Sequence, residues 1–222
     1  MSNPVIVVVG AGPGMGASVA RRYGREGYDV ALIGLPPDQL DELGKTLQAE
    51  GITTGWTAVD VVDQQAMREA IARFGGRADR IDVLHFNPSA FRQKDPLALG
   101  VDELLEDVAL GVGGLLTAVQ AARPFMSAGG RVTATGSMAA DEPWHEACSL
   151  GVQKAGLRNL VLSLDRTLEP DGIRAVSVTV RGTLKRGTPF DPDRVAEALF
   201  AAAHQPEDDW RSEVPYDGTE GS

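Results

Sequence analysis

The chain has 222 residues, of which 43% are hydrophobic and 23% charged, and its net charge is −10. This length suits one large core and is short for two domains, so we expect a single domain. The acidic balance argues against a nucleic-acid surface, which needs a basic stripe. The single cysteine, Cys148, excludes an internal disulfide, and the three histidines have no zinc-like spacing, so no metal site is expected.

The first residues carry no targeting signal that we recognise. The apolar run behind residues 1–4 is only five residues long, and no basic cluster precedes it. No stretch approaches the roughly 20 apolar residues of a membrane span. We therefore expect a soluble, cytoplasmic protein that does not bind a membrane.

Apolar residues alternate between strand and helix patterns along the chain. Strands are expected at residues 5–9, 29–35, 55–59, 80–86, 130–135, 173–180 and 210–214. Helices are expected at residues 17–23, 37–50, 63–74, 101–126 (one helix or two), 145–168 and 191–204. Seven apolar strands separated by helical crossovers predict a doubly wound (Rossmann) α/β fold, with a seven-stranded parallel sheet and helices on both faces. The domain would span residues 1–216, and the polar tail 217–222 is expected to be disordered.

The first strand runs into the glycine-rich segment GAGPGMG, residues 10–16, and then into a helix. Glycine admits positive φ and lets a phosphate approach the backbone, while the start of the helix attracts an anion. This order is typical of a loop that holds the pyrophosphate of a dinucleotide, which makes Gly10, Gly14, Met15 and Gly16 candidate cofactor-binding residues. Tight strand-to-helix turns also use glycine for steric reasons alone, so the loop indicates a cofactor before it indicates a reaction.

Further motifs along the chain resemble those of the short-chain dehydrogenase/reductase family. They are the glycine spacing itself, Val59-Asp60-Val61 after the third strand, Asn87 in Phe86-Asn87-Pro88-Ser89, Gly136-Ser137, Lys154, and residues 170–174. The resemblance spans residues 5 to about 188. It implies cofactor-binding roles for Asp60, Val61, Asn87 and Lys154, although Val9 stands where the family has threonine before the glycines.

The resemblance implies a reaction that moves a hydride between a nicotinamide cofactor and a carbonyl or alcohol carbon. The family's catalytic serine maps to Ser137 and its lysine to Lys154. The tyrosine position falls on Leu150, four residues before Lys154 and thirteen after Ser137, and the asparagine position falls on Gly111. Losing a general acid typically lowers the rate roughly 100- to 10,000-fold, so ketone reduction by the usual route should be severely impaired.

Other side chains near the tyrosine position are candidate proton donors. His145 lies at the start of the long helix, and its charge changes near neutral pH, so we take it as the candidate replacement acid. The alternative is a surface histidine. Cys148 is better explained as a small apolar filler, and Ser149 points about 100° away from position 150. His85, inside a strand, is expected to pack in the core.

The preferred cofactor is open between NADP and NAD. NAD-preferring relatives carry an acidic residue at the end of the second strand and NADP-preferring ones an arginine just beyond it, but this chain has Gly34 and Leu35. The missing acid favours NADP slightly. Lys185 and Arg186 would attract an anionic substrate or the cofactor phosphates, or they form a solvated turn.

The sequence therefore predicts an NAD(P)-dependent oxidoreductase that acts on a small carbonyl or alcohol compound through Ser137, Lys154 and an unidentified proton source. The alternative keeps the fold and gives up hydride transfer: an isomerase, cyclase or dehydratase, or a non-catalytic nucleotide-binding protein. The resemblance also implies a homodimer or homotetramer packed through the helices at residues 101–126 and 145–168.

Overall fold

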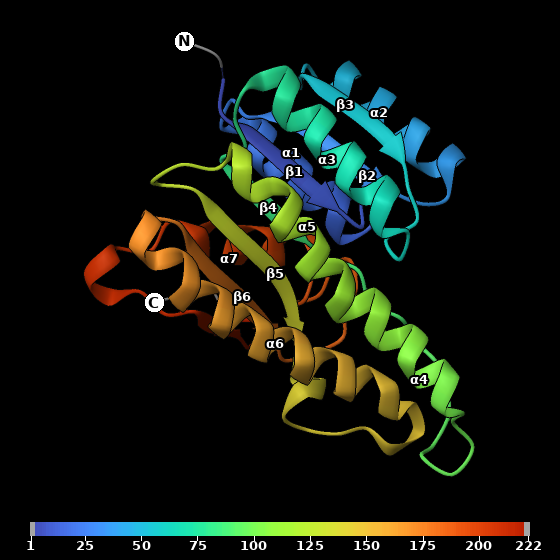
Figure 1. Ribbon diagram of the computed structural model, residues 1–222. Coiled ribbons are helices and arrows are strands. Elements are labelled where there is room, and N and C mark those ends of the chain that lie inside the picture. Colours follow the sequence, from blue (N-terminus) through green and yellow to red (C-terminus); the bar gives the residue numbers. More distant parts are fainter. Residues whose placement is uncertain (1–2, 220–222) are drawn as a thin grey trace.

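The computed structural model describes residues 3–219, and its seven strands form one parallel sheet (Figure 1). The order in the sheet is β3-β2-β1-β4-β5-β6-β7. The strands are β1 (Val5–Val9), β2 (Asp29–Gly34), β3 (Thr54–Ala58), β4 (Val83–Phe86), β5 (Arg131–Ser137), β6 (Arg174–Val180) and β7 (Glu213–Tyr216). The predicted fold class is confirmed. The sheet reverses its winding between β1 and β4, where open α/β sheets bind ligands.

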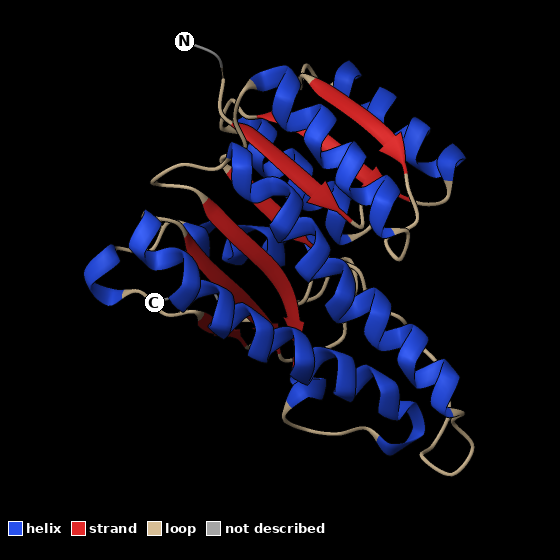
Figure 2. Ribbon diagram, viewed as in Figure 1, coloured by secondary structure: helices blue, strands red, loops and turns tan. Residues whose placement is uncertain are grey.

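Helices cover both faces of the sheet (Figure 2). One face carries α1 (Met15–Arg25), α2 (Pro37–Ala49) and α7 (Pro192–Ala203), and the other carries α3 (Gln64–Ala78), α5 (Gly114–Ala122) and α6 (Cys148–Leu168). A further helix, α4 (Val101–Val108), packs on α6. Because both faces are covered, every residue of β1 is buried, which explains its uninterrupted apolar run.

Several predicted boundaries are wrong. The helix expected to end at Phe74 continues to Ala78 and includes Gly75, where a Cβ would lie 2.5 Å from the Phe125 ring. The strand expected from residue 80 begins only at Val83, since the carboxylate of Asp82 accepts a hydrogen bond from Val5 N at 2.7 Å. The last strand begins at Glu213 rather than at residue 210.

Residues 101–126 form two α-helices joined by a π-helical turn, Ala109–Gly113, and end in a 3₁₀ turn, Arg123–Phe125. The stretch Val101–Phe125 is, by length and composition, apolar enough to cross a membrane. Core helices meet the same criterion, and α5 buries Leu115 and Val119 against the sheet. We interpret it as a core helix. The predicted long helix at 145–168 begins as α-helix only at Cys148, after a 3₁₀ turn, His145–Ala147.

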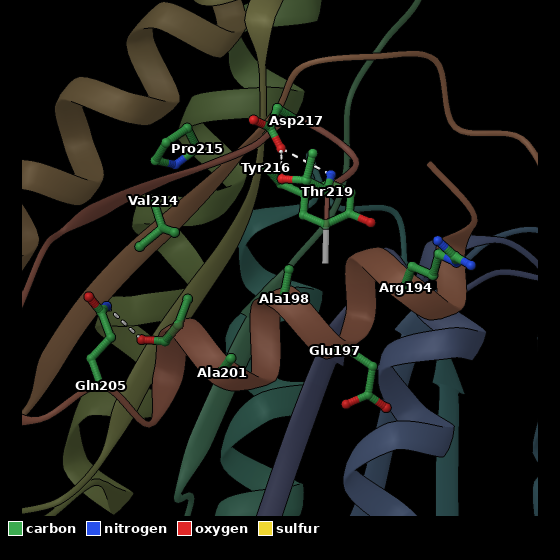
Figure 3. A pocket seen from close by; sticks show the side chains of 11 residues that line it. Arg194, Glu197, Ala198, Ala201, Gln205, Val214, Pro215, Tyr216, Asp217 and Thr219 are labelled. Carbon is green, nitrogen blue, oxygen red and sulfur yellow. Dashed lines mark hydrogen bonds between the residues drawn. The ribbon is translucent and has the colours of Figure 1, made fainter. Parts of the chain in front are cut away.

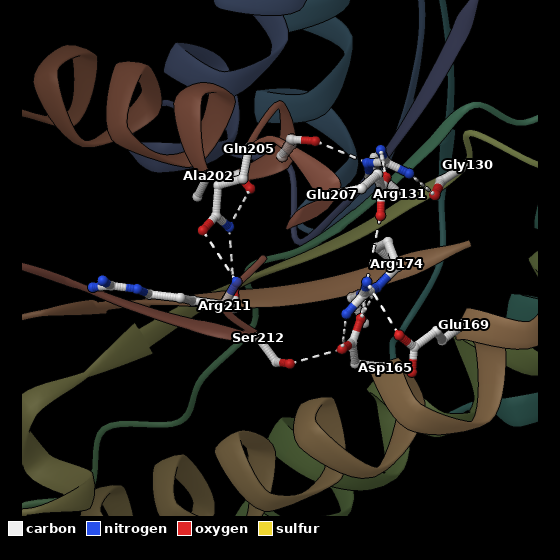
Figure 4. A network of polar contacts seen from close by, with 12 residues as sticks. Gly130, Arg131, Asp165, Glu169, Arg174, Ala202, Gln205, Glu207, Arg211 and Ser212 are labelled. Carbon is white, nitrogen blue, oxygen red and sulfur yellow. Dashed lines mark hydrogen bonds and ion pairs between the residues drawn. The ribbon is translucent and has the colours of Figure 1, made fainter. Parts of the chain in front are cut away.

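A polar network closes the amino ends of β5 and β6 (Figure 4). Asp165 of α6 accepts hydrogen bonds from Arg174 Nε and Nη2 at 2.9 and 2.8 Å and from Ser212 Oγ at 2.7 Å. Burial acts to raise the pKa of Asp165, but the hydrogen bonds from Arg174 and Ala175 N outweigh it and lower that pKa. Arg131 and Arg174 both pair with Glu207. This network lies at the amino ends of the strands, whereas the candidate site lies at the opposite, carboxyl edge of the sheet.

A hollow of about 740 Å³ lies between α7 and β7, lined in part by Ala198, Val214 and Tyr216 (Figure 3). Next to it, Asp217 Oδ1 accepts hydrogen bonds from Thr219 N and Oγ1 at 3.0 and 2.6 Å, which forms a turn. The rest of the predicted disordered tail, residues 220–222, lies outside the described residues. Disorder there stays a prediction.

Candidate active site

The glycine-rich loop is held tightly against β2 and open on its other side. Gly10, with a φ of +79°, and Ala11 both donate their N–H to Ile33 O at 2.9 Å. A Cβ on Gly16 would lie 2.7 Å from Ala11 Cα, whereas a Cβ on Gly14 would meet no protein atom within 4 Å. Helix α1 begins at Met15 without a side-chain cap and without an acidic residue in its first turn. An open loop at an uncapped helix start suits an anion.

The packing at the end of β2 explains why this strand does not end in an acidic residue. A Cβ on Gly34 would overlap the carbonyl oxygen of Ala11. Glycine at position 34 is therefore required by the approach of the glycine-rich loop. A carboxylate that would bind ribose hydroxyls is excluded from that position.

Two further predicted cofactor positions lie after β3. Val61 is buried against α5, where a Cβ on Gly114 would overlap it. Asp60 is exposed, and its Oδ1 accepts a hydrogen bond from Val62 N at 3.1 Å. Both residues thus lie at the carboxyl edge of the sheet, with the side chain of Asp60 toward solvent.

A cavity of about 800 Å³ opens at the carboxyl ends of β4, β5 and β6. It brings together five positions singled out from the sequence: Met15, Asn87, Ser137, Leu150 and Lys154. Asn87 also donates from Nδ2 to Gly10 O at 3.3 Å, which connects the glycine-rich loop to the cavity. The predicted cofactor loop and the predicted catalytic residues therefore share one site.

Lys154 is the buried cation of this site. Its side chain lies on α6, the residue is 5% exposed, and Nζ donates to Thr135 O at 2.8 Å. Burial lowers the pKa of Lys154 to about 8. Its charge also contributes, after burial itself, to lowering the pKa of His85 to about 3. His85 is fully buried, as expected, with Nδ1 2.9 Å from Thr133 Oγ1.

Ser137 ends β5 and lies at the cavity wall. Its Oγ accepts a hydrogen bond from Ala139 N at 3.2 Å. Because the hydroxyl acts as an acceptor in that bond, its own hydrogen remains available for a bond to a ligand. The side chain can therefore donate to a substrate oxygen.

No tyrosine lines this cavity among the described residues, which include all three tyrosines of the chain. Tyr23 is buried with its ring 5.1 Å from that of Tyr28. Tyr216 donates its hydroxyl to Pro189 O at 2.7 Å and lines the hollow between α7 and β7 (Figure 3). The side chain that lines the cavity at the position four residues before Lys154 is that of Leu150.

The structure does not bring the other candidate proton donors into the cavity lining. His145 is exposed on the 3₁₀ turn before α6. Cys148 is partly buried, and Ser149 is fully buried with an Oγ that has no hydrogen-bond partner among the described residues. None of the three is among the residues that line the cavity.

Sequence reasoning missed Gln153, the residue before Lys154. Its amide is buried and binds the loop after β4 twice: Oε1 accepts from Ala90 N at 3.0 Å, and Nε2 donates to Ala90 O at 2.9 Å. A Cβ on Gly111 would lie 2.6 Å from Gln153 Oε1. The glycine at the family's asparagine position thus makes room for Gln153. The only signal in the sequence was three glycines inside a helical pattern.

Sequence reasoning also missed Phe91, Trp144 and Leu184, which line the cavity from three loops. Arg186, whose role was left open, donates from Nη2 to Pro13 O at 3.3 Å, so its guanidinium lies beside the glycine-rich loop. Loop positions of this kind carry no periodic pattern, and their convergence appears only in the folded chain.

Comparison with known proteins identifies the family. The sequence model of a protein family described as "short chain dehydrogenase" matches residues 4–190, which is most of the chain. The chain therefore belongs to the short-chain dehydrogenase family.

Relatives of known name align with this chain over nearly its full length. An uncharacterized oxidoreductase of Staphylococcus saprophyticus is 26% identical over 219 residues, covering 93% of each chain. An uncharacterized oxidoreductase of Listeria monocytogenes is 23% identical, covering 94% of this chain and 93% of the relative. A metagenomic short-chain oxidoreductase solved in complex with NADP superposes with a TM-score of 0.85 at 23% identity, over 97% of this chain and 98% of the other. At this identity the solved structure supports the fold.

Proposed function

We propose that this protein is an NAD(P)-dependent oxidoreductase that acts on a carbonyl or alcohol compound with an atypical active site. The observation that carries the proposal is the shared cavity: Lys154 and Ser137 line it together with Met15 and Asn87, which adjoin the glycine-rich loop. Family membership and the oxidoreductase names of the relatives support the reaction class.

The residues present fit a dinucleotide. The loop is open at Gly14, where a side chain would meet no protein atom within 4 Å, and the start of α1 is uncapped. Gly10, Gly14, Met15 and Gly16 would hold the pyrophosphate, with Arg186 beside Pro13 O. Asp60 and Val61 would lie at the adenine, and Asn87 and Lys154 at the nicotinamide ribose. A bound nicotinamide would supply or accept the hydride, while the carbonyl oxygen exchanges a proton with protein or solvent.

Under this proposal, the side chains that line the cavity have separate roles. Lys154, buried and held by Thr135 O, keeps its charge below about pH 8 and would donate to ribose hydroxyls. Ser137 would donate a hydrogen bond to the substrate oxygen. Leu150 offers no proton at the cavity wall, so under this proposal a proton arrives through solvent or through a residue outside the lining, and turnover is slow.

We propose NADP in preference to NAD, by a small margin. The support is the close approach of Ala11 O to Gly34, which leaves no room for the carboxylate that would repel a 2′-phosphate. No arginine takes its place at Leu35 or Pro36, so discrimination should be weak.

The alternative is a non-redox enzyme, such as an isomerase, cyclase or dehydratase, or a non-catalytic nucleotide-binding protein on the same fold. The observation that favours it is Leu150 at the cavity wall, with all three tyrosines placed elsewhere. In that case the dinucleotide loop would serve binding alone.

Calorimetry and a spectroscopic assay separate these functions. We expect NADP to bind the purified protein, and NADPH to be oxidised slowly across a panel of aldehydes and ketones, with Lys154→Met losing that activity. Binding without hydride transfer would favour the alternative. Failure to bind either dinucleotide would contradict both.

We also propose a homodimer or homotetramer packed through α4, α5 and α6. The support is a set of exposed apolar side chains on α4 and α6: Val101, Leu105, Val152 and Leu162. Light scattering tests this directly, and a monomer at assay concentrations would contradict it.

A further inference from the structure

Three large apolar side chains lie partly exposed in the lining of the candidate active site. They are Phe91, Trp144 and Leu184, with exposed fractions of 60%, 44% and 41%. Each comes from a different loop, following β4, β5 and β6 respectively. Leaving apolar surface in water costs about 25 cal/mol per Å². Three loops that each direct such a side chain to one cavity indicate a surface that a ligand covers.

Two of these side chains form one aromatic surface. The ring centroids of Phe91 and Trp144 lie 5.8 Å apart, and the ring planes are inclined by 36°. Trp144 Nε1 donates to Glu146 Oε2 at 3.2 Å, which orients the indole while leaving its faces unbonded. Aromatic side chains favour offset or edge contacts with a further flat ring, beyond the gain from buried area.

Apart from Lys154, the charged groups around this surface are held in ion pairs. Arg92, next to Phe91, binds Asp107 and Glu106 at 3.1 Å each and does not line the cavity. Of the described lining residues only Glu142 and Lys154 are charged; Glu142 pairs with Arg181 at 3.3 Å, and Lys154 Nζ is bound to Thr135 O. The one lining cation without a carboxylate partner is Lys154, and it is the residue proposed to bind the cofactor ribose, so an anionic ligand would have to compete with the cofactor for it.

We propose that the site takes an uncharged carbonyl compound, or its alcohol, built on an aromatic ring. The ring would lie on Phe91 and Trp144, and the oxygen would accept a hydrogen bond from Ser137. The substrate role of this ligand rests on the proposed oxidoreductase function, whereas its binding does not.

The test measures binding, separately from turnover, on the full chain. Acetophenone carries a ring and no charge, acetone lacks the ring, and benzoylformate adds a carboxylate to it. Each is titrated without cofactor and again with saturating NADP⁺, which cannot reduce a ketone, and followed by calorimetry and tryptophan fluorescence. We expect acetophenone to bind about tenfold or more tightly than the other two probes.

Matched variants locate the ring. Phe91→Ala and Trp144→Ala should each weaken acetophenone binding about 3- to 10-fold. Trp144→Phe should keep the affinity but lose the fluorescence change, because Trp56 and Trp210 do not line this cavity. Leu97→Ala is the control, since Leu97 is 99% exposed on the same loop outside the cavity lining, and it should change nothing.

The outcomes separate this inference from the proposed function. Selective binding of acetophenone without any turnover supports the aromatic site and contradicts hydride transfer. Equal affinity for acetone and acetophenone in both conditions, or unchanged affinity in Phe91→Ala and Trp144→Ala, overturns the inference. Turnover of carbonyl compounds without preference for a ring would also overturn it, while leaving the oxidoreductase function standing.

Discussion

The proposed nucleotide side and the proposed catalytic side of this site use different parts of the chain. At the glycine-rich loop the work is done by backbone: Gly10 takes a positive φ, Gly14 leaves an open face, and Gly16 packs against Ala11. At the cavity the proposed chemistry would depend on single side chains at positions 137, 150 and 154, which line it together. A backbone site tolerates most substitutions around it, whereas one substitution can remove a proton donor. Our proposal therefore combines a retained cofactor site with an altered catalytic one.

The largest effect is expected from placing a tyrosine at position 150, which tests whether the catalytic side lacks only a proton donor. We expect Leu150→Tyr to raise the rate of carbonyl reduction roughly 100- to 10,000-fold, because a general acid would then line the cavity beside the buried Lys154. The measurement is NADPH oxidation with a fixed ketone. Leu150→Phe, with the same ring and no hydroxyl, is the control. If both variants match the original rate, position 150 is not the missing donor.

The pKa of Lys154 gives a pH-dependent test of the catalytic side. Burial lowers that pKa from 10.5 to about 8, so the lysine is protonated in both folded and unfolded chains below pH 8. Between pH 8 and 10.5 the unfolded chain retains a proton that the folded chain has lost. The free energy of unfolding should therefore gain up to about 1.4 kcal/mol per pH unit from this residue. Urea unfolding at increasing pH should show this contribution in the original protein but not in Lys154→Met, and identical slopes would refute it.

Two glycine substitutions test whether the glycine-rich loop packs and binds phosphate as proposed. Gly16→Ala should lower the free energy of unfolding by about 1–3 kcal/mol, because its Cβ would lie 2.7 Å from Ala11 Cα. In Gly14→Ala the added Cβ would meet no protein atom within 4 Å, so the free energy of unfolding should stay close to that of the original protein. Its effect should instead appear in calorimetry, as NADP affinity weakened about tenfold. Unchanged affinity in Gly14→Ala would mean that phosphate does not approach this loop.

The pairing of Gln153 with Gly111 tests how the catalytic side keeps its shape. Gln153→Ala would leave Ala90 N and O without their partners and should cost about 1–2 kcal/mol of unfolding free energy. Gly111→Ala places a Cβ 2.6 Å from Gln153 Oε1 and should also destabilise. Because the clash needs both residues, the double variant should be more stable than the sum predicts, by about 0.5 kcal/mol or more. Additive values in this cycle would count against the pairing.

The fold could be predicted from the sequence because the alternation of strand and helix patterns is repeated along the chain and each pattern depends on neighbouring residues. Strands β1, β2, β4, β5 and β6 are almost entirely buried and are bounded by helices, so each leaves a short run of mostly buried residues between helical patterns, whereas the edge strand β3 is only partly buried. The helix end expected at Phe74 was wrong for the opposite reason, because α3 continues through Gly75. Its small size serves a contact with Phe125, fifty residues away in the chain, rather than a local helix end.

The candidate site was predictable only in part. Ser137, Leu150 and Lys154 were found through the family resemblance and the spacing it implies, and the structure gathers them in one cavity. The exposed position of His145, outside the cavity lining, was not predictable because it depends on the 3₁₀ turn that precedes α6. Gln153 was missed because its function depends on Ala90, a residue sixty-three positions away.

The smallest expected effect concerns Arg186, where the two sides of the site meet. Its guanidinium donates to Pro13 O from the loop after β6, so it would lie near the pyrophosphate, which NAD and NADP share. Arg186→Ala should weaken both cofactors equally, about 2- to 5-fold, as expected for an exposed charge. Lys185→Ala is the matched neighbouring control and should have less effect. If calorimetry shows that Arg186→Ala loses NADP affinity alone, Arg186 binds the 2′-phosphate instead, and cofactor preference is then set by the carboxyl-terminal loop rather than by β2.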